Sequence, residues 1–145
     1  MAHGASKWAP TIPPESKRSH LPLALRLLTT LSLRKNNLGP VGAKALADAL
    51  ASGRAVLTSL DLGRCSIGVE GAKALAASLA VNMVLTSLSL QGNNIGSEGA
   101  KAIAEALRFN AVLTTLDVRA IRLWDEGKKV LRDAAEGREG FQLLV

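Results

Sequence analysis

The chain has 145 residues, enough for one domain, and 48% of them are hydrophobic while only 3% are aromatic. This composition favours thin, repeated layers of Leu and Ala over a core built round large rings. The net charge of +6 is spread along the chain, with a mild concentration in its first 27 residues, and favours acidic partners only weakly. Cys65 is the single cysteine, which excludes an internal disulfide and predicts a reducing, intracellular setting.

Residues 1–20 precede any regular pattern. Prolines at positions 10, 13 and 14, scattered charges and the lack of an apolar period predict a disordered basic leader. Trp8 is its one aromatic side chain, and we interpret it as an exposed tail residue, with a docking anchor as the alternative. Residues 21–27 are apolar apart from Arg26 and predict a short cover over the N-terminal end of the stack that follows.

No membrane-spanning or secretory segment is predicted. The apolar run from Leu21 to Leu33 is interrupted by Arg26 and is too short to cross a bilayer. It also lacks the cleavage region of a signal peptide. We therefore expect a cytoplasmic or otherwise intracellular protein with no membrane association, and the basic leader keeps mitochondrial targeting as a minor alternative.

Residues 28–140 contain one pattern four times. The copies begin at Leu28, Leu57, Leu85 and Leu113, which lie 29, 28 and 28 residues apart. A period of this length is typical of stacked repeats, in which each unit buries its apolar face against its neighbours. The pattern predicts one repeat domain over residues 28–145.

Each copy joins a strand to a helix. In the first copy Leu31 and Leu33 alternate with polar residues, which predicts a strand with one inward apolar side. Ala43, Leu46 and Leu50 then recur at helical spacing and predict one apolar helix stripe. Strands joined by helices run parallel, so the predicted fold class is α/β.

A glycine recurs at the start of every helical half. We expect a bulky side chain at these positions to hold the helix and the strand apart. The positions are Gly42, Gly71, Gly99 and Gly127.

The fourth copy departs from the pattern, as terminal repeats do when one side faces water. Ile121 stands where earlier copies have Asn or Cys, and Trp124 stands where they have Gly. We interpret it as a C-terminal cap formed by Trp124 with the surface of Lys128, Lys129, Arg132 and Asp133. Residues 141–145 predict a last edge strand.

The chain resembles leucine-rich repeat proteins. The family motif LxxLxLxxN/CxL is matched by Leu28, Leu31, Leu33, Asn36 and Leu38, by Leu57, Leu60, Leu62, Cys65 and Ile67, and by Leu85, Leu88, Leu90, Asn93 and Ile95. The repeat length and the GAKALA helix are similar to the ribonuclease-inhibitor-like subtype, which includes the repeats of NOD-like receptors and Ran GTPase-activating protein. The resemblance implies a short right-handed solenoid with a concave parallel sheet and convex helices. It also implies that Asn36 and Asn93, and more weakly Cys65, bind loop backbone groups between repeats.

The concave side of such a sheet carries a row of polar residues. Charge gathers at the C-terminal ends of the strands, where Arg suits bidentate contacts with carboxylates or phosphates. The row either keeps the sheet soluble or forms a protein-binding surface, and the resemblance favours binding. Its candidate binding residues are Arg34, Lys35, Asp61, Arg64, Ser89, Gln91, Asp117 and Arg119.

This concave face is small. Strands about 4.8 Å apart and about 17 Å long give four strands a face of a few hundred Å². A standard interface needs about 800 Å² from each partner. We therefore expect a partner to touch the adjoining loops or the ends of the stack as well.

The convex side carries a row of lysines. Glu70–Lys73, Glu98–Lys101 and Glu126–Lys129 are spaced three apart and, with Lys44, predict a solvated face with local ion pairs. An anion or nucleic-acid track is the alternative, but no aromatic residue interleaves with these lysines as single-strand binding requires.

No catalytic arrangement is found. Neither histidine lies near a patterned acid or nucleophile, Cys65 is at a buried structural position, and no phosphate-binding glycine loop or metal-ligand spacing occurs. We expect no enzyme activity, no cofactor and no small-molecule substrate.

The leading hypothesis is a non-catalytic protein-interaction module or scaffold. One alternative is a GTPase-activating or other enzyme-regulatory protein, which the resemblance raises. The other is a structural subunit on an RNA-rich or acidic assembly, suggested by the pI near 10.0.

Overall fold

Strands and helices alternate strictly along residues 28–145, the part of the chain that this computed structural model describes. The strands are β1 (Thr30–Ser32), β2 (Ser59–Asp61), β3 (Ser87–Ser89), β4 (Thr115–Asp117) and β5 (Gln142–Leu144). The helices are α2 (Gly39–Ala51), α3 (Gly68–Val81), α4 (Gly96–Leu107) and α5 (Asp125–Ala135). The predicted leader and the predicted cover over residues 21–27 lie outside the described residues.

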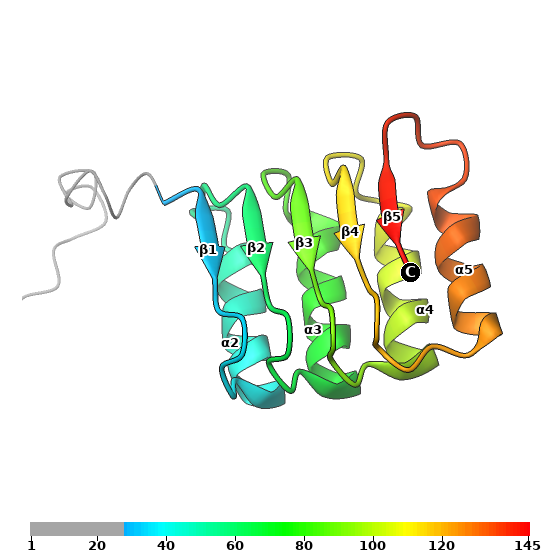
Figure 1. Cartoon of the computed structure of the whole chain (residues 1–145). Helices are drawn as coiled ribbons and strands as arrows, with labels where there is room; N and C mark the ends of the chain where they lie inside the picture. The colour runs from blue at the N-terminus through cyan, green and yellow to red at the C-terminus, as the bar shows by residue number, and fades with distance from the viewer. Residues whose placement is uncertain (1–27) are drawn as a thin grey trace, which may run out of the picture.

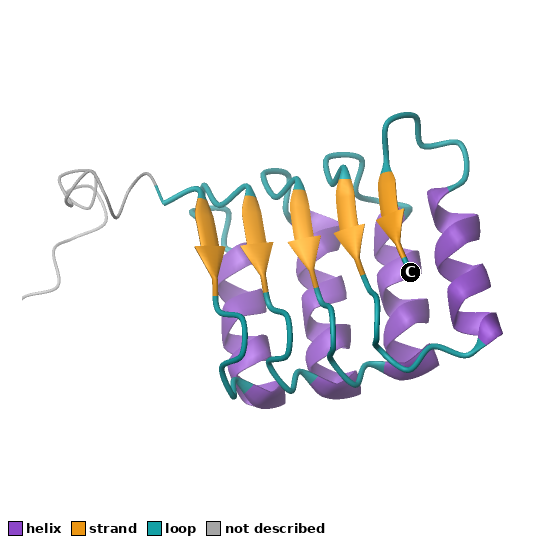
Figure 2. Ribbon diagram, in the orientation of Figure 1, coloured by secondary structure: helices purple, strands orange, loops and turns teal. Residues whose placement is uncertain are grey.

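All five strands form one parallel sheet in chain order. The sheet forms one layer of the molecule and the helices form the other (Figures 1 and 2). Paired strands hold Leu31, Leu60, Leu88, Leu116 and Leu143 in a single register, so that equivalent leucines lie side by side. The α/β solenoid predicted from the repeats is confirmed.

The core lies between the sheet and the helices. Leu60, Leu88 and Leu116 on the inner face of the sheet are at most 1% exposed, and Ile103 on α4 is fully buried. Small residues of the helix stripe, such as Ala43, are also fully buried and let successive helices approach each other.

Asn93 joins neighbouring repeats at the strand-to-helix loops. Its amide oxygen accepts hydrogen bonds from the backbone N–H groups of Cys65 and Ile67 at 3.0 and 3.1 Å. Its amide nitrogen donates to the carbonyls of Leu62 and Leu90 at 2.7 and 3.0 Å. The inter-repeat role expected for Asn93 is confirmed.

Cys65 has a similar but weaker role, whereas the expectation for Asn36 is wrong. The buried Cys65 thiol donates to the Leu33 carbonyl of the preceding repeat at 3.0 Å. Asn36 is exposed, and within residues 28–145 its side chain donates only to the carbonyls of Leu33 and Arg34 in its own repeat. The reason is positional, because no earlier repeat precedes Asn36 among the described residues.

The recurring glycines make room for a different neighbour than predicted. A Cβ at Gly71 would lie 2.6 Å from Ile67 and 3.0 Å from Ala43 of the preceding helix. A Cβ at Gly99 would lie 3.0 Å from Ala72 on α3. The close approach is therefore to the neighbouring helix and to the loop that begins the glycine's own helix, and the predicted clash with a strand is wrong.

The C-terminal end confirms one expectation and corrects another. Strand β5 is the predicted last edge strand and pairs with β4. Trp124 does not cover the end of the stack, because 78% of its surface is exposed to solvent. The backbone of Trp124 is extended, with a φ of −76° and a ψ of 166°, so α5 starts at Asp125, one residue later in the repeat than α3 and α4.

Asn93→Ala should lower the free energy of unfolding by about 3 kcal/mol, because it leaves buried backbone groups without partners. Asn36→Ala, which removes the equivalent side chain where it is exposed, should cost under about 1 kcal/mol. Urea unfolding followed by circular dichroism measures both. Equal losses for the two variants would contradict the role assigned to Asn93.

Candidate interaction surface

The polar row predicted on the outer face of the sheet is held in one register. Paired strands bring Ser32, Asp61, Ser89 and Asp117 into line at the C-terminal ends of the strands. The loops that follow the strands carry the arginines. The carboxylates of Asp61 and Asp117 each accept the backbone N–H two residues further on, at 2.8 and 3.1 Å, which fixes the direction of the chain at those points.

Arg34 reaches across two repeats. Its guanidinium donates to the Gln91 side-chain oxygen at 3.1 Å and lies 3.7 Å from the Asp61 carboxylate. It crosses Gly63, where any Cβ would collide with it. The side chain is 33% exposed, so it remains accessible from solvent while being held from two sides. The structure thus brings together three of the predicted residues, Arg34, Asp61 and Gln91.

Arg64 repeats this arrangement one repeat further along. A Cβ on Gly92 would lie 2.8 Å from the Arg64 Cγ, so its side chain runs over Gly92 as that of Arg34 runs over Gly63. Arg64 is exposed, and its guanidinium has no hydrogen-bonding side chain or ion-pair partner within residues 28–145. It therefore offers its donors to solvent or to a ligand.

Asp117 and Arg119 form a bidentate ion pair. Arg119 Nε and Nη2 donate to the two carboxylate oxygens of Asp117 at 3.0 and 2.8 Å. These hydrogen bonds hold the pKa of Asp117 below its usual range, although burial of the carboxylate opposes the shift. Asp117 is only 9% exposed, so it orients Arg119 and offers little surface of its own.

The remaining predicted residues differ in access. Lys35 is exposed on its loop with a φ of 63°. Ser89 is half-buried, and its hydroxyl accepts a long 3.5 Å hydrogen bond from the backbone N–H of Gln91. The accessible cations of the row are therefore Arg34, Lys35, Arg64 and Arg119.

The convex lysines form local ion pairs, with one correction. Lys73 pairs with Glu70, and Lys101 pairs with Glu98, each at 3.7 Å. The expected Glu126–Lys129 pair is replaced, because Lys101 of α4 lies 3.3 Å from Glu126. Lys129 instead pairs with Asp133 along α5 at 3.0 Å.

A second inter-repeat ladder escaped the sequence analysis. In the helix-to-strand connections Asn82 donates to the Leu50 carbonyl at 2.9 Å, and Asn110 donates to the carbonyls of Leu79 and Asn82 at 2.8 and 3.0 Å. Their 28-residue spacing was the available signal. This spacing lies outside the family motif, so the motif does not indicate it.

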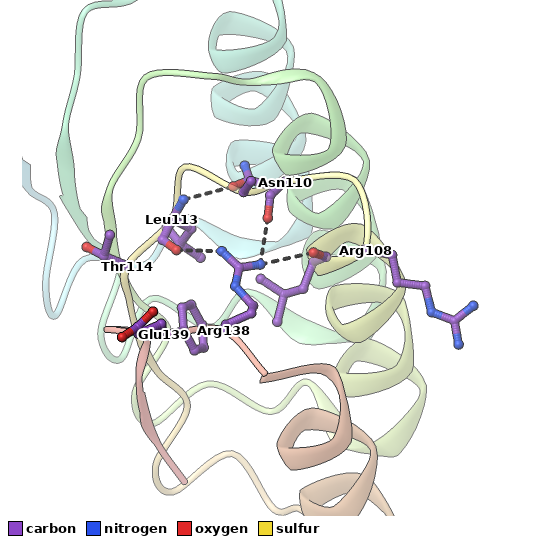
Figure 3. Close-up of a pocket in the computed structure, with 9 residues that line it drawn as sticks. Arg108, Asn110, Leu113, Thr114, Arg138 and Glu139 are labelled. Atoms are coloured by element: carbon purple, nitrogen blue, oxygen red, sulfur yellow. Dashed lines mark hydrogen bonds between the residues drawn. The ribbon is translucent and has the colours of Figure 1, made fainter. Parts of the chain in front are cut away.

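Arg138 continues this ladder at the last connection (Figure 3). It donates to the carbonyls of Leu107, Asn110 and Leu113 at 3.0, 2.6 and 2.7 Å. Its guanidinium also lies 4.5 Å from the Phe141 ring centre. The surrounding pocket of about 410 Å³ is lined by residues of this connection and of the preceding one, and the Arg138 guanidinium in its lining is bound to backbone carbonyls.

Two further features of the described chain bear on its chemistry. Within residues 28–145 no three His, Cys, Asp or Glu side chains gather where they could hold a metal ion. In the same part of the chain, none of the helices combines the length and the apolar character that crossing a membrane requires.

Comparison with known proteins identifies the repeats. A family model described as leucine-rich repeat matches residues 24–47, 55–76 and 81–104. No curated protein matches the chain significantly in sequence. Among solved structures, leiomodin-1 actin-binding site 2 is similar with a TM-score of 0.72 and 20% identity, over 82% of this chain and 70% of that one. This likeness concerns the fold alone. Three segments of the chain thus match the leucine-rich repeat model, and they lie within an α/β solenoid.

Proposed function

We propose that this chain is a non-catalytic protein-interaction module that binds through the concave sheet face and its adjoining loops. The observation that carries the proposal is which arginine side chains are held by neighbouring side chains and which are not. Arg34 and Arg119 are fixed by neighbouring side chains, so little conformational freedom remains to be lost when they bind a partner. Arg64 lies between them along the chain and keeps its donors unused among the described residues.

The partner offers carboxylates to this row and also contacts the loops or ends of the stack. Arginine forks match carboxylates in a bidentate geometry, and the row carries more cations than accessible anions. The strands contain only three residues each, so the sheet face supplies a small part of the about 800 Å² that a standard interface needs from each partner.

Two finer assignments belong to the same proposal. The 28-residue spacing and the helices of 11–14 residues support repeats of the ribonuclease-inhibitor-like subtype. The buried free thiol of Cys65 supports a reducing, intracellular setting.

Affinity purification from the native source, followed by mass spectrometry, identifies candidate partners. Actin enters the same binding assay as a named candidate, because the similar solved structure is an actin-binding site of leiomodin-1. Binding constants for purified candidates then test the surface.

Arg64→Ala, and Arg34→Ala with Arg119→Ala, should each weaken binding by about tenfold or more, as the loss of a central arginine does at other interfaces. Arg132→Ala is the matched control, because it removes an exposed arginine from the convex helix α5. Titration calorimetry measures each dissociation constant. An equal loss from Arg132→Ala would contradict the concave placement.

The Asp117–Arg119 pair should stabilise the fold at neutral pH and lose this effect in acid. Because the folded-state pKa of Asp117 is lowered, its contribution is complete above the unfolded value of about 3.9 and disappears as the pH falls through the folded value. Asp117→Asn should therefore destabilise the protein at pH 7 and progressively less below about pH 4.

Urea unfolding at several pH values measures this dependence. Asp133→Asn is the control, because its ion pair with Lys129 is exposed and should contribute little at any pH. A stability difference for Asp117→Asn that stays constant between neutral and acid pH would refute the assignment.

A further inference from the structure

The loop between β4 and α5 repeats the backbone conformation of the loop between β2 and α3 (Figure 1). Arg64 and Ser66 of the earlier loop have φ angles of 53° and 55°. Their counterparts two repeats later, Ala120 and Arg122, have φ angles of 55° and 56°. The other two strand-to-helix loops have no positive φ at the second of these positions. The second and fourth repeats therefore present the N–H groups of this loop in the same way.

In the second repeat this conformation aims two backbone N–H groups at one acceptor. The Asn93 amide oxygen, which comes from the next repeat, accepts from the N–H groups of Cys65 and Ile67 at 3.0 and 3.1 Å. The equivalent donors of the fourth repeat are the N–H groups of Ile121 and Leu123. Within residues 28–145 neither of these two groups donates a hydrogen bond. The loop is thus arranged for an acceptor that the described residues do not supply.

A pocket of about 280 Å³ lies at this loop. Its apolar lining comes from Val118, Ala120, Ile121, Leu123 and Val145, and its cations are Arg119, Arg122 and Lys128. The lining contains no acidic residue. In the described part of the chain the side chains of Arg122 and Lys128 have no hydrogen bond or ion pair. The pocket therefore combines two open N–H donors, two uncompensated cations and an apolar wall.

We propose that this pocket binds a carboxylate that carries a short apolar group. The carboxylate takes the position that the Asn93 oxygen holds in the second repeat and accepts from the N–H groups of Ile121 and Leu123. Arg122 and Lys128 balance its charge, and the apolar group contacts the apolar lining. The proposal does not depend on the interaction surface described above, because a free carboxylic acid satisfies the same donors.

The chemistry of the lining selects this class of ligand. Neighbouring N–H groups in a loop of alternating handedness form a concavity that favours anions. The unpaired cations favour a charged oxygen over a neutral amide oxygen, because hydrogen bonds to ionised groups are the stronger ones. Asp117 lies close in sequence, but its carboxylate is already held by Arg119 at 2.8 and 3.0 Å. The apolar wall disfavours a phosphate, whose oxygens would all need polar partners.

Hydrogen exchange of the unliganded protein tests whether the donors are open. The amides of Ile121 and Leu123 should exchange at least about tenfold faster than that of Val118. Val118 is the matched comparison, because it lies in the same repeat and donates to the Leu144 carbonyl at 2.8 Å. Two-dimensional NMR resolves the three amides. Protection of Ile121 and Leu123 equal to that of Val118 would show that another group already binds them and would overturn the proposal.

A titration followed by NMR tests the ligand, with propionate as the probe at constant ionic strength. The amide protons of Ile121 and Leu123 should move downfield in a saturable manner, because a charged acceptor deshields them. The amides of Cys65 and Ile67 are the internal control and should stay in place, since Asn93 already fills their acceptor position. Propionamide should bind at least about tenfold more weakly, because it lacks the charge.

Arg122→Gly tests the contribution of the cation while keeping the backbone conformation, because glycine adopts a positive φ without strain. It should raise the dissociation constant of propionate by about fivefold or more. Lys35→Gly is the matched control, because it removes an exposed cation with a φ of 63° from the loop of the first repeat. It should leave the constant unchanged. Equal effects of the two variants would contradict a site at the last loop.

Two capped peptides distinguish the sources of the carboxylate. The peptide acetyl-Ala-Glu-Ala-amide offers an internal acidic side chain, and acetyl-Ala-Leu offers a C-terminal carboxylate beside an apolar group. Saturable shifts with one peptide assign that source, and shifts with propionate alone assign the pocket to free carboxylic acids. The proposal is overturned when no carboxylate moves the Ile121 and Leu123 amides, when Cys65 and Ile67 move equally, or when inorganic phosphate binds more tightly than propionate.

Discussion

Every repeat of this chain depends on its neighbours to bury the leucines of its strand. A strand of three residues cannot enclose an apolar face, so the inner leucines become buried only where another strand and another helix lie on each side. The single register of Leu60, Leu88 and Leu116 follows from this constraint, because a slip by one residue would turn the leucines to solvent. The first repeat is partly exposed for the same reason, because the described residues contain no repeat before it.

A second constraint is that backbone groups in the loops need hydrogen-bond partners. Two series of polar side chains provide them. At the strand-to-helix loops, Asn93 and Cys65 bind backbone groups of neighbouring repeats. At the helix-to-strand connections, Asn82, Asn110 and Arg138 do the same. Apolar packing sets the spacing of the repeats, and these directed hydrogen bonds fix their rotation about each other, because buried polar groups are costly when unpaired.

The proposed binding surface is a by-product of this construction. Alternation along each strand sends one side chain in two to the core, so the outward residues are free of packing demands. Glycines at two loop positions let Arg34 and Arg64 lie flat across the adjoining repeat. A charged row in a fixed arrangement results, and it differs from the convex side, where exposed lysines form separate pairs along and between helices.

The spacing of Leu and Ala along the sequence was sufficient to predict the parallel α/β solenoid, the buried position of Cys65 and a last edge strand within residues 141–145, because that spacing follows the periodic burial of side chains. Which side chains meet across repeats depends on the folded arrangement of the stack. Arg34 with Gln91, Lys101 with Glu126 and Arg138 with three carbonyls join residues 25–57 positions apart, and helix or strand periodicity carries no information on such pairs. The exposed Asn36 and Trp124 differ from expectation for the same reason, since position in the stack, rather than residue type, sets their burial.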